Sequence, residues 1–204
     1  MPLRLPRLYP IVDVDLCRGR GLDPLAVLDA FLAGGARFLQ LRDKSPSTGD
    51  RVALADAAMA RVRAAGARLV INDRPDIARL SGADGVHVGQ DDLSVEDVRS
   101  VLGPDAIVGL STHDEQQIED AFRTDATYIA VGPIYGTDTK QTGYSARGLE
   151  LVRVAAGTGH PVVAIGGITL ARMPEVLAAG AASVAVISDL LAGNPEERVR
   201  AYLV

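Results

Sequence analysis

Short runs rich in β-branched residues alternate with amphipathic stretches eight times along the chain. This alternation is typical of strands that are each followed by a helix. The predicted strands cover residues 8–13, 38–42, 69–73, 85–89, 107–111, 128–132, 162–167 and 183–188. The stretches between them predict helices near residues 24–34, 48–65, 75–80, 94–102, 114–122, 148–157, 170–179 and 195–203.

Eight strand–helix units in 204 residues predict an α/β protein, a single-domain (β/α)8 TIM barrel that spans residues 1–204. Glycine–alanine pairs follow several predicted helices, as expected where a left-handed glycine ends a helix before the next strand. These junctions are Gly34-Gly35-Ala36, Gly66-Ala67, Gly82-Ala83 and Gly180-Ala181. A doubly wound open sheet is the alternative fold.

Composition narrows the class of protein. Hydrophobic residues make up 48% of the chain and aromatic residues 4%, which predicts a core of Ala, Val, Ile and Leu. The net charge of −5 and the lack of a Lys/Arg run argue against nucleic-acid and membrane-surface partners. Cys17 is the one cysteine, so no intrachain disulfide forms. The polar start and the lack of a long apolar run predict a cytoplasmic protein; whether it forms a homo-oligomer stays open.

In a TIM barrel, ligands bind at the carboxyl ends of the strands. Gln40 and Arg42 share one face of the second predicted strand, and Lys44 follows on roughly the same side. Polar groups that point into a barrel mouth are costly unless they bind something, so these three are candidate ligand-binding residues. We interpret Asp43 as a surface residue in an ion pair with Arg42.

Asp73 and Asp92 follow the third and fourth predicted strands. Helix capping is the usual role of such aspartates, but Ser94 can cap the next helix and Pro75 suits a first helical turn. Both aspartates are therefore candidate ligands of Mg²⁺, which takes one or two carboxylates and leaves its other positions to substrate phosphates and water. The choice of Asp92 over Asp91 rests on spacing alone.

Ser111 ends the fifth predicted strand. The residues from Thr112 to Glu115 form a capping-box pattern that leaves Ser111 available to a ligand. We interpret His113, in the first turn of that helix, as a solvated surface residue. His87 and His160 receive no functional role.

A connection of fifteen residues, Pro133 to Arg147, follows the sixth predicted strand and is long enough to be a binding loop. Its two threonines and one lysine suit a phosphate, and a merely flexible polar loop is the alternative; these residues are Thr137, Thr139 and Lys140. The seventh and eighth strands end in a glycine pair and a serine, at the usual phosphate site of this fold. The chain thus offers two anion sites, which predicts two phosphorylated substrates.

Six motifs, in this order and spacing, resemble the thiamine-phosphate synthase (thiamine-phosphate pyrophosphorylase) family over essentially the whole chain. They are Gln40-Leu-Arg-Asp-Lys44, Asn72-Asp-Arg74 with Asp76, Gly82-Ala-Asp-Gly-Val-His-Val-Gly-Gln-Asp-Asp92, Gly109-Leu-Ser111, Gly132-Pro-Ile-Tyr with Thr137-Asp-Thr-Lys140, and Ala164-Ile-Gly-Gly-Ile168. The resemblance implies a barrel transferase that joins 4-amino-2-methyl-5-hydroxymethylpyrimidine diphosphate to a thiazole phosphate, or to its carboxylate. Diphosphate would leave in a dissociative, Mg²⁺-assisted step.

The resemblance also implies a role for each matching residue. The pyrimidine diphosphate would be held by Gln40, Arg42, Lys44 and Asn72. Mg²⁺ would be bound by Asp73 and Asp92. The thiazole phosphate would be received by Thr137, Thr139, Gly167, Ile187 and Ser188. The residues expected to act at the reacting centre are Arg42, Lys44, Ser111 and Lys140.

Two other functions remain open, and a third, sugar-phosphate isomerisation, is disfavoured. A thiazole tautomerase on the same scaffold resembles this family but uses a His beside the glycine of the sixth strand and lacks the pair of metal carboxylates. Here that position is Pro133, and both Asp73 and Asp92 are present. A non-catalytic barrel would bind the same ligands without consuming them. A sugar-phosphate isomerase would require a Glu or His base at a strand end.

Overall fold

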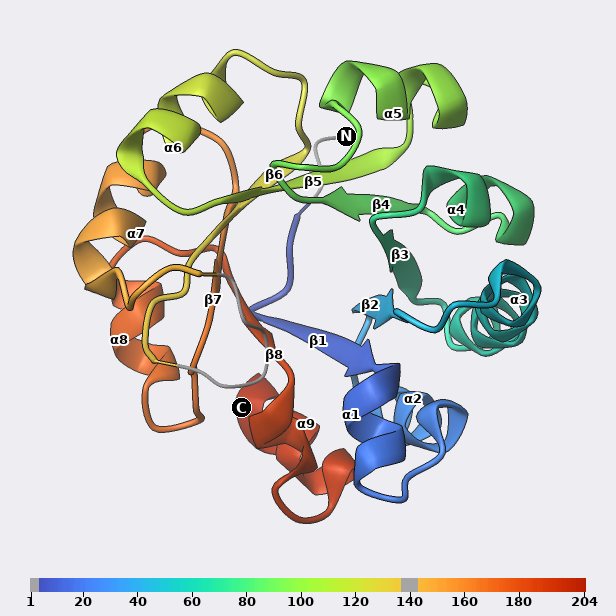
Figure 1. Cartoon of the computed structure of the whole chain (residues 1–204). Helices are drawn as coiled ribbons and strands as arrows, with labels where there is room; N and C mark the ends of the chain where they lie inside the picture. Colours follow the sequence, from blue (N-terminus) through green and yellow to red (C-terminus); the bar gives the residue numbers. More distant parts are fainter. Residues whose placement is uncertain (1–3, 137–142) are drawn as a thin grey trace.

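Eight parallel strands close into a barrel in the computed structural model, which describes residues 4–136 and 143–204 (Figure 1). The strands are β1 (Leu8–Asp13), β2 (Phe38–Arg42), β3 (Arg68–Asn72), β4 (Gly85–Val88), β5 (Ile107–Thr112), β6 (Tyr128–Val131), β7 (Val162–Ile165) and β8 (Ser183–Val186). Each strand pairs with the next in the chain, and β8 pairs with β1. The predicted (β/α)8 TIM barrel is confirmed, and the open sheet is excluded.

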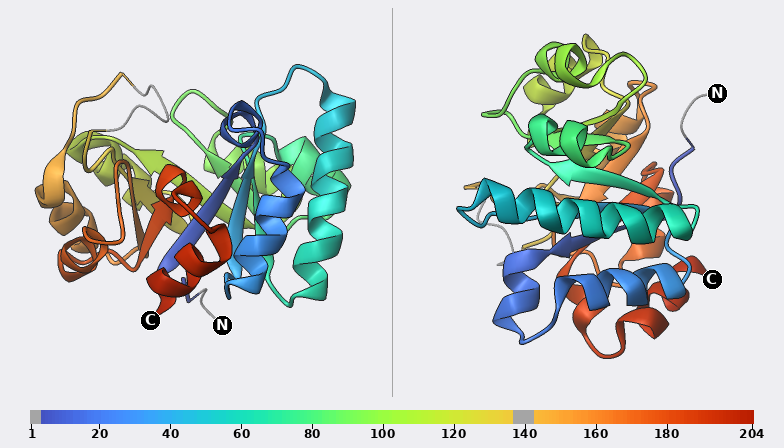
Figure 2. Two further views of the ribbon diagram at one scale, coloured as in Figure 1. Left: turned by 90° about the horizontal axis from the view of Figure 1, so that it is seen from below. Right: turned by 90° about the vertical axis from the view of Figure 1, so that its right-hand side faces the viewer.

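Helices surround the barrel on its outer side (Figures 1 and 2). They are α1 (Val14–Gly19), α2 (Pro24–Ala33), α3 (Thr48–Ala64), α4 (Pro75–Ser81), α5 (Val95–Leu102), α6 (Glu115–Phe122), α7 (Gly148–Ala156), α8 (Met173–Ala178) and α9 (Pro195–Leu203), with a short 3-10 helix, η1 (Ser188–Leu191). The sequence predicted neither α1 nor η1. Within the described residues, no helix has the length and apolar character needed to cross a membrane.

The strands separate two apolar layers because successive side chains point to opposite faces. One layer lies between the strands and the helices and is largely aliphatic. The other fills the barrel interior with Tyr9, Ile11, Phe38, Val70, Ile107, Tyr128, Ala130, Val163 and Ala185. The expectation of a mostly aliphatic core holds for both layers, since six of the nine interior residues are Ala, Val or Ile. The sequence did not reveal that three aromatic rings pack together in the interior, with centroids 4.5 to 6.1 Å apart.

Several strands end earlier than predicted, which moves candidate residues into loops. β7 ends at Ile165 because Gly166 and Gly167 have φ angles of +102° and +61°, outside the strand region. β8 ends at Val186, so Ile187 and Ser188 also leave the sheet. The two glycines therefore present only backbone groups at the carboxyl end of the barrel, and Ile187 and Ser188 present side chains as well.

Candidate functional site

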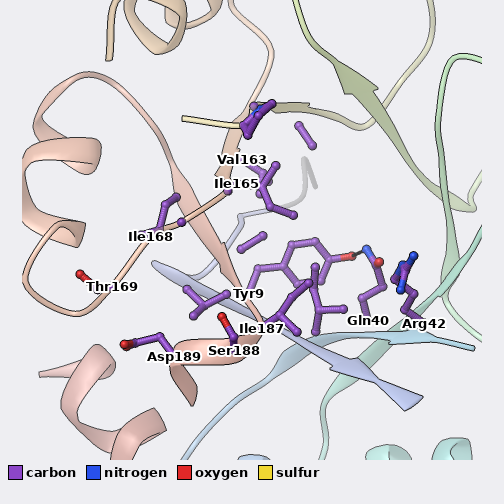
Figure 3. Close-up of a pocket in the computed structure, with 18 of the residues that line it drawn as sticks. Tyr9, Gln40, Arg42, Val163, Ile165, Ile168, Thr169, Ile187, Ser188 and Asp189 are labelled. Carbon is purple, nitrogen blue, oxygen red and sulfur yellow. Dashed lines mark hydrogen bonds between the residues drawn. The ribbon is translucent and has the colours of Figure 1, made fainter. Parts of the chain in front are cut away.

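A pocket of about 500 Å³ opens at the carboxyl ends of the strands, within the range typical of small-molecule sites. Seven predicted site residues line it: Gln40, Arg42, Asn72, Ser111, Gly167, Ile187 and Ser188. In Figure 3, Gln40 and Arg42 lie on one side and Ser188 on the other. The structure therefore brings part of each predicted anion site to one cavity, but Lys44, Asp73 and Asp92 are not among the residues that line it.

Arg42 is held by a residue that sequence reasoning missed. Its Nη1 donates to Asp13 Oδ2 at 2.5 Å, and Asp13 is only 3% exposed at the end of β1. The other oxygen of Asp13 accepts from Leu16 N at 2.9 Å and caps α1. The expected ion pair between Arg42 and Asp43 is wrong, because Asp43 instead accepts a hydrogen bond from Ser45 N at 2.8 Å.

Asp73 and Asp92 lie next to each other, and neither caps a helix. Asp92 Oδ2 accepts from Gly89 N at 2.8 Å, while Ser94 caps α5 as predicted. Asp73 forms an ion pair with Lys44 and adopts a left-handed backbone, with φ of +61°.

Electrostatics at this pair favour a cation. Partial burial raises the pKa of Asp92, and the nearby negative charge of Asp73 raises it further, although the bond from Gly89 N opposes the shift. Both effects disfavour the ionised form of Asp92, and a bound cation would favour it. Two adjacent carboxylates are the donor set that Mg²⁺ commonly takes from a protein. In residues 4–136 and 143–204, no cluster of three or more His, Cys, Asp or Glu side chains could hold a metal.

Ser111 and His87 contact each other inside the barrel mouth. Ser111 Oγ lies 2.9 Å from His87 Nε2, and both residues line the pocket. The predicted capping box is wrong at its first position, because Thr112 belongs to β5 and Asp114 caps α6. Ser111 is nevertheless left to the pocket, as predicted, while His87 had been given no role.

His113 is not a solvated surface residue. Its Nδ1 lies 2.5 Å from Gly132 O, its ring stacks on Tyr144 with centroids 4.3 Å apart, and it lines the pocket. The backbone turn between β5 and α6, which the sequence does not reveal, directs the ring inward. The predicted residues Thr137, Thr139 and Lys140 lie outside the described residues.

The opposite side of the pocket is built from the loops after β7 and β8. A Cβ atom at position 167 would lie 2.5 Å from Gly136 O, so only glycine allows this close backbone approach. Asp189 Oδ2 accepts from Tyr202 Oη at 2.6 Å and from Leu170 N at 3.3 Å. It also forms an ion pair with Arg198. The Asp189 carboxylate therefore connects the loop after β7, the loop after β8 and α9.

Comparisons with known proteins agree with this geometry. A family model described as thiamine monophosphate synthase matches residues 8–190. The chain is 45% identical over 195 residues to a thiamine-phosphate synthase of Roseiflexus sp. (strain RS-1), covering 95% of this chain and 82% of that protein. It is 44% identical over 207 residues to the corresponding protein of Koribacter versatilis (strain Ellin345), covering 98% and 96%. A solved thiamine phosphate pyrophosphorylase from Pyrococcus furiosus superimposes with a TM-score of 0.85 at 29% identity, covering 96% of this chain and 93% of that one.

Proposed function

This chain belongs to the thiamine-phosphate synthase family, and on that premise we propose how its pocket binds two substrates and joins them. The protein is a transferase of thiamine biosynthesis. Its substrates are 4-amino-2-methyl-5-hydroxymethylpyrimidine diphosphate and 4-methyl-5-(2-phosphoethyl)thiazole or its carboxylate. Its products are thiamine phosphate and diphosphate, and the carboxylate would release CO2 as well. The observation that carries the proposal is a single pocket lined by Arg42 on one side and by the loops after β7 and β8 on the other.

The pyrimidine diphosphate occupies the side formed by β2, β3 and β5. Gln40 and Asn72, which are 3% and 7% exposed, hold the ring in the barrel mouth. Arg42 and Lys44 lie beside them and balance the charge of the diphosphate. Because Asp13 and Asp73 already orient these two cations, little side-chain freedom is lost when the substrate binds.

Mg²⁺ fits the adjacent carboxylates of Asp73 and Asp92. The raised pKa of Asp92 supports this assignment, since a bound cation relieves the repulsion between the two acids. When bound, the ion supplies positive charge to the diphosphate oxygens. It would be shared between the protein and the substrate.

The thiazole phosphate occupies the opposite side, against the loops after β7 and β8. Gly167, Ile187 and Ser188 line the pocket on this side, and their backbone N–H groups are the proposed donors to the phosphate. Thr137 and Thr139 complete this site in the proposal. The two substrates then meet near the centre of the pocket, where interior side chains such as Ala130 and Val163 exclude water.

The reaction is a dissociative substitution. The bond between the pyrimidine methylene carbon and the diphosphate oxygen breaks, and its electron pair leaves with the diphosphate. The lone pair of the thiazole nitrogen then forms the new carbon–nitrogen bond. Arg42, Lys44, Ser111 and Lys140 hold the leaving group while its charge grows. The attacking nitrogen carries no proton, so the protein needs no general base.

The tautomerase alternative is disfavoured by Pro133, which stands where that enzyme has its histidine, and by the presence of the acid pair. A regulatory barrel makes a different prediction in solution. Purified protein should convert the two phosphorylated precursors to thiamine phosphate, with equal release of diphosphate, and EDTA should stop the reaction. Saturable binding of both precursors without product would instead favour the regulatory barrel.

A further inference from the structure

A buried chain of hydrogen bonds crosses the barrel at the floor of the pocket, from Gln40 to Ser111, and four of its five members line the pocket. It runs from Gln40 Nε2 to Tyr9 Oη at 3.0 Å and from Tyr9 Oη to Tyr128 Oη at 2.9 Å. It continues from Tyr128 Oη to His87 Nδ1 at 3.0 Å and from His87 Nε2 to Ser111 Oγ at 2.9 Å. Figure 3 shows the Tyr9 hydroxyl against the amide of Gln40.

The chain is tightly enclosed. Its five side chains are between 0% and 8% exposed. Gly109 on β5 provides the space where two of them meet, because a Cβ atom there would lie 2.3 Å from Tyr128 Oη and 2.4 Å from His87 Nδ1. Burial raises the pKa of Tyr9 and Tyr128, so both hydroxyls keep their protons and each donates one hydrogen bond.

A consistent direction runs from Gln40 to Ser111. Nε2 of Gln40 is a donor only, so Tyr9 accepts from it. When the hydrogen of Tyr9 goes on to Tyr128, that of Tyr128 goes to His87 Nδ1. A histidine that accepts at Nδ1 carries its proton on Nε2 and donates it to Ser111 Oγ. The hydrogen of Ser111 is then available to a ligand, as is the carbonyl oxygen of Gln40.

We propose that this chain sets the hydrogen-bonding pattern of the pocket, with the carbonyl of Gln40 as an acceptor and the hydroxyl of Ser111 as a donor. Tyr9, Tyr128 and His87 are positioning residues that maintain it. On the proposed function, on which this assignment of ligand groups rests, Gln40 accepts from the exocyclic amino group of the pyrimidine. Ser111 donates to the leaving diphosphate as its charge grows.

The two tyrosines give separable kinetic effects. Tyr128→Phe removes the donor to His87, so Ser111 can turn its hydrogen toward the imidazole; we expect kcat to fall by about three- to tenfold with KM nearly unchanged. Tyr9→Phe removes the acceptor of Gln40 Nε2, so the amide can turn over. We expect KM for the pyrimidine diphosphate to rise by about three- to tenfold.

Thr112→Val is the matched control. Thr112 follows Ser111 on β5, is fully buried, and donates from Oγ1 to Ala130 O at 3.1 Å outside the chain. This variant loses a buried hydroxyl from the same strand, and its kinetic constants should stay within twofold of those of the unchanged protein. If kcat fell equally in Thr112→Val and Tyr128→Phe, the loss of either buried hydroxyl would disturb the packing of β5 and β6 in the same way. That result would overturn the proposal.

The direct test is ¹⁵N NMR of the ligand-free protein, which has three histidines, His87, His113 and His160. Their signals can be assigned with His113→Gln and His160→Gln. We expect neutral His87 to carry its proton on Nε2, and Tyr128→Phe to give a mixture of tautomers. A proton on Nδ1 in the unchanged protein, or the same tautomer in Tyr128→Phe as before, would reject the proposal. The expected tautomers without any thiamine phosphate synthesis would reject the proposed function but support the direction of the chain.

Discussion

Replacing Asp92 by asparagine separates the proposed metal role from a structural one. The amide oxygen of Asn can still accept from Gly89 N, now bonded to Asp92 Oδ2 at 2.8 Å, so the loop after β4 should keep its shape. The negative charge beside Asp73 disappears. We expect kcat to fall by about 10²- to 10³-fold, the usual cost of removing one preorganised electrostatic group from an active site.

The same substitution should stabilise the protein when Mg²⁺ is absent. The pKa of Asp92 is raised above 3.8 in the folded state, so the folded protein binds the proton more tightly than the unfolded chain does. Below pH 3.8 the group is protonated in both states and contributes nothing. As pH rises through the raised folded pKa, ionisation lowers the free energy of unfolding. Urea denaturation in EDTA should therefore show Asp92→Asn to be more stable than the unchanged protein at pH 7.5, with the difference vanishing below pH 3.8.

Addition of Mg²⁺ should reverse this order. At about 100 times its Kd, a ligand that binds only the folded state adds about 2.7 kcal/mol, which corresponds to a rise in Tm of about 5–10 °C for a protein of this size. Asp92→Asn should lose most of that rise. Asp91→Asn, which removes the same charge one residue earlier, is the matched control and should behave like the unchanged protein. Near-normal turnover in Asp92→Asn, or an undiminished Mg²⁺-dependent rise in Tm, would refute the metal assignment.

Three further substitutions test the supports of the pocket. Asp13→Asn should lower the free energy of unfolding by about 3–5 kcal/mol in urea denaturation and raise KM for the pyrimidine diphosphate, because it breaks a buried ion pair with Arg42; unchanged stability would contradict this. Asp189→Asn should raise KM for the thiazole phosphate alone in steady-state assays, since it weakens the contacts that hold the loops after β7 and β8. An equal rise in KM for both substrates would show that Asp189 supports the whole pocket and not this side of it. At position 73, where φ is +61°, glycine should be more stable than alanine by about 1 kcal/mol in urea denaturation. The reverse order would show that the left-handed backbone carries no strain.

The order and type of most elements follow from the sequence, because a barrel repeats one local pattern. The eight strands and eight of the nine α-helices of the described chain lie within about three residues of their predicted bounds. The exception, α1, begins at Val14, directly after β1 with no turn residue to separate them. The predicted ends at Gly167 and Ser188 are two residues too late, because the backbone leaves the sheet at the glycine pair after Ile165 and at Ile187 after Val186.

The interior of the barrel was harder to predict than its outer layer. All four residues of β4 are buried, so the pattern cannot tell whether His87 points inward or outward. Its inward position depends on pairing with β5, where it lies opposite Gly109. Tyr9 and Tyr128 come from strands that are 119 residues apart in sequence and meet only because the barrel closes. Contacts of this kind depend on the register between strands, which no local pattern contains.

Candidate residues were selected because they had no local structural role, and the structure shows both the value and the limit of that criterion. It led to Asp92 and Ser111 because Ser94 and the turn before α6 supply the caps that these residues would otherwise provide. It could not have led to Asp13, whose Oδ1 caps α1 while its Oδ2 holds Arg42. A carboxylate has two oxygens, so a structural role for one does not exclude a functional role for the other. Strand-end acids that cap a helix therefore remain candidates for orienting a substrate-binding cation wherever the barrel places an arginine on the adjacent strand.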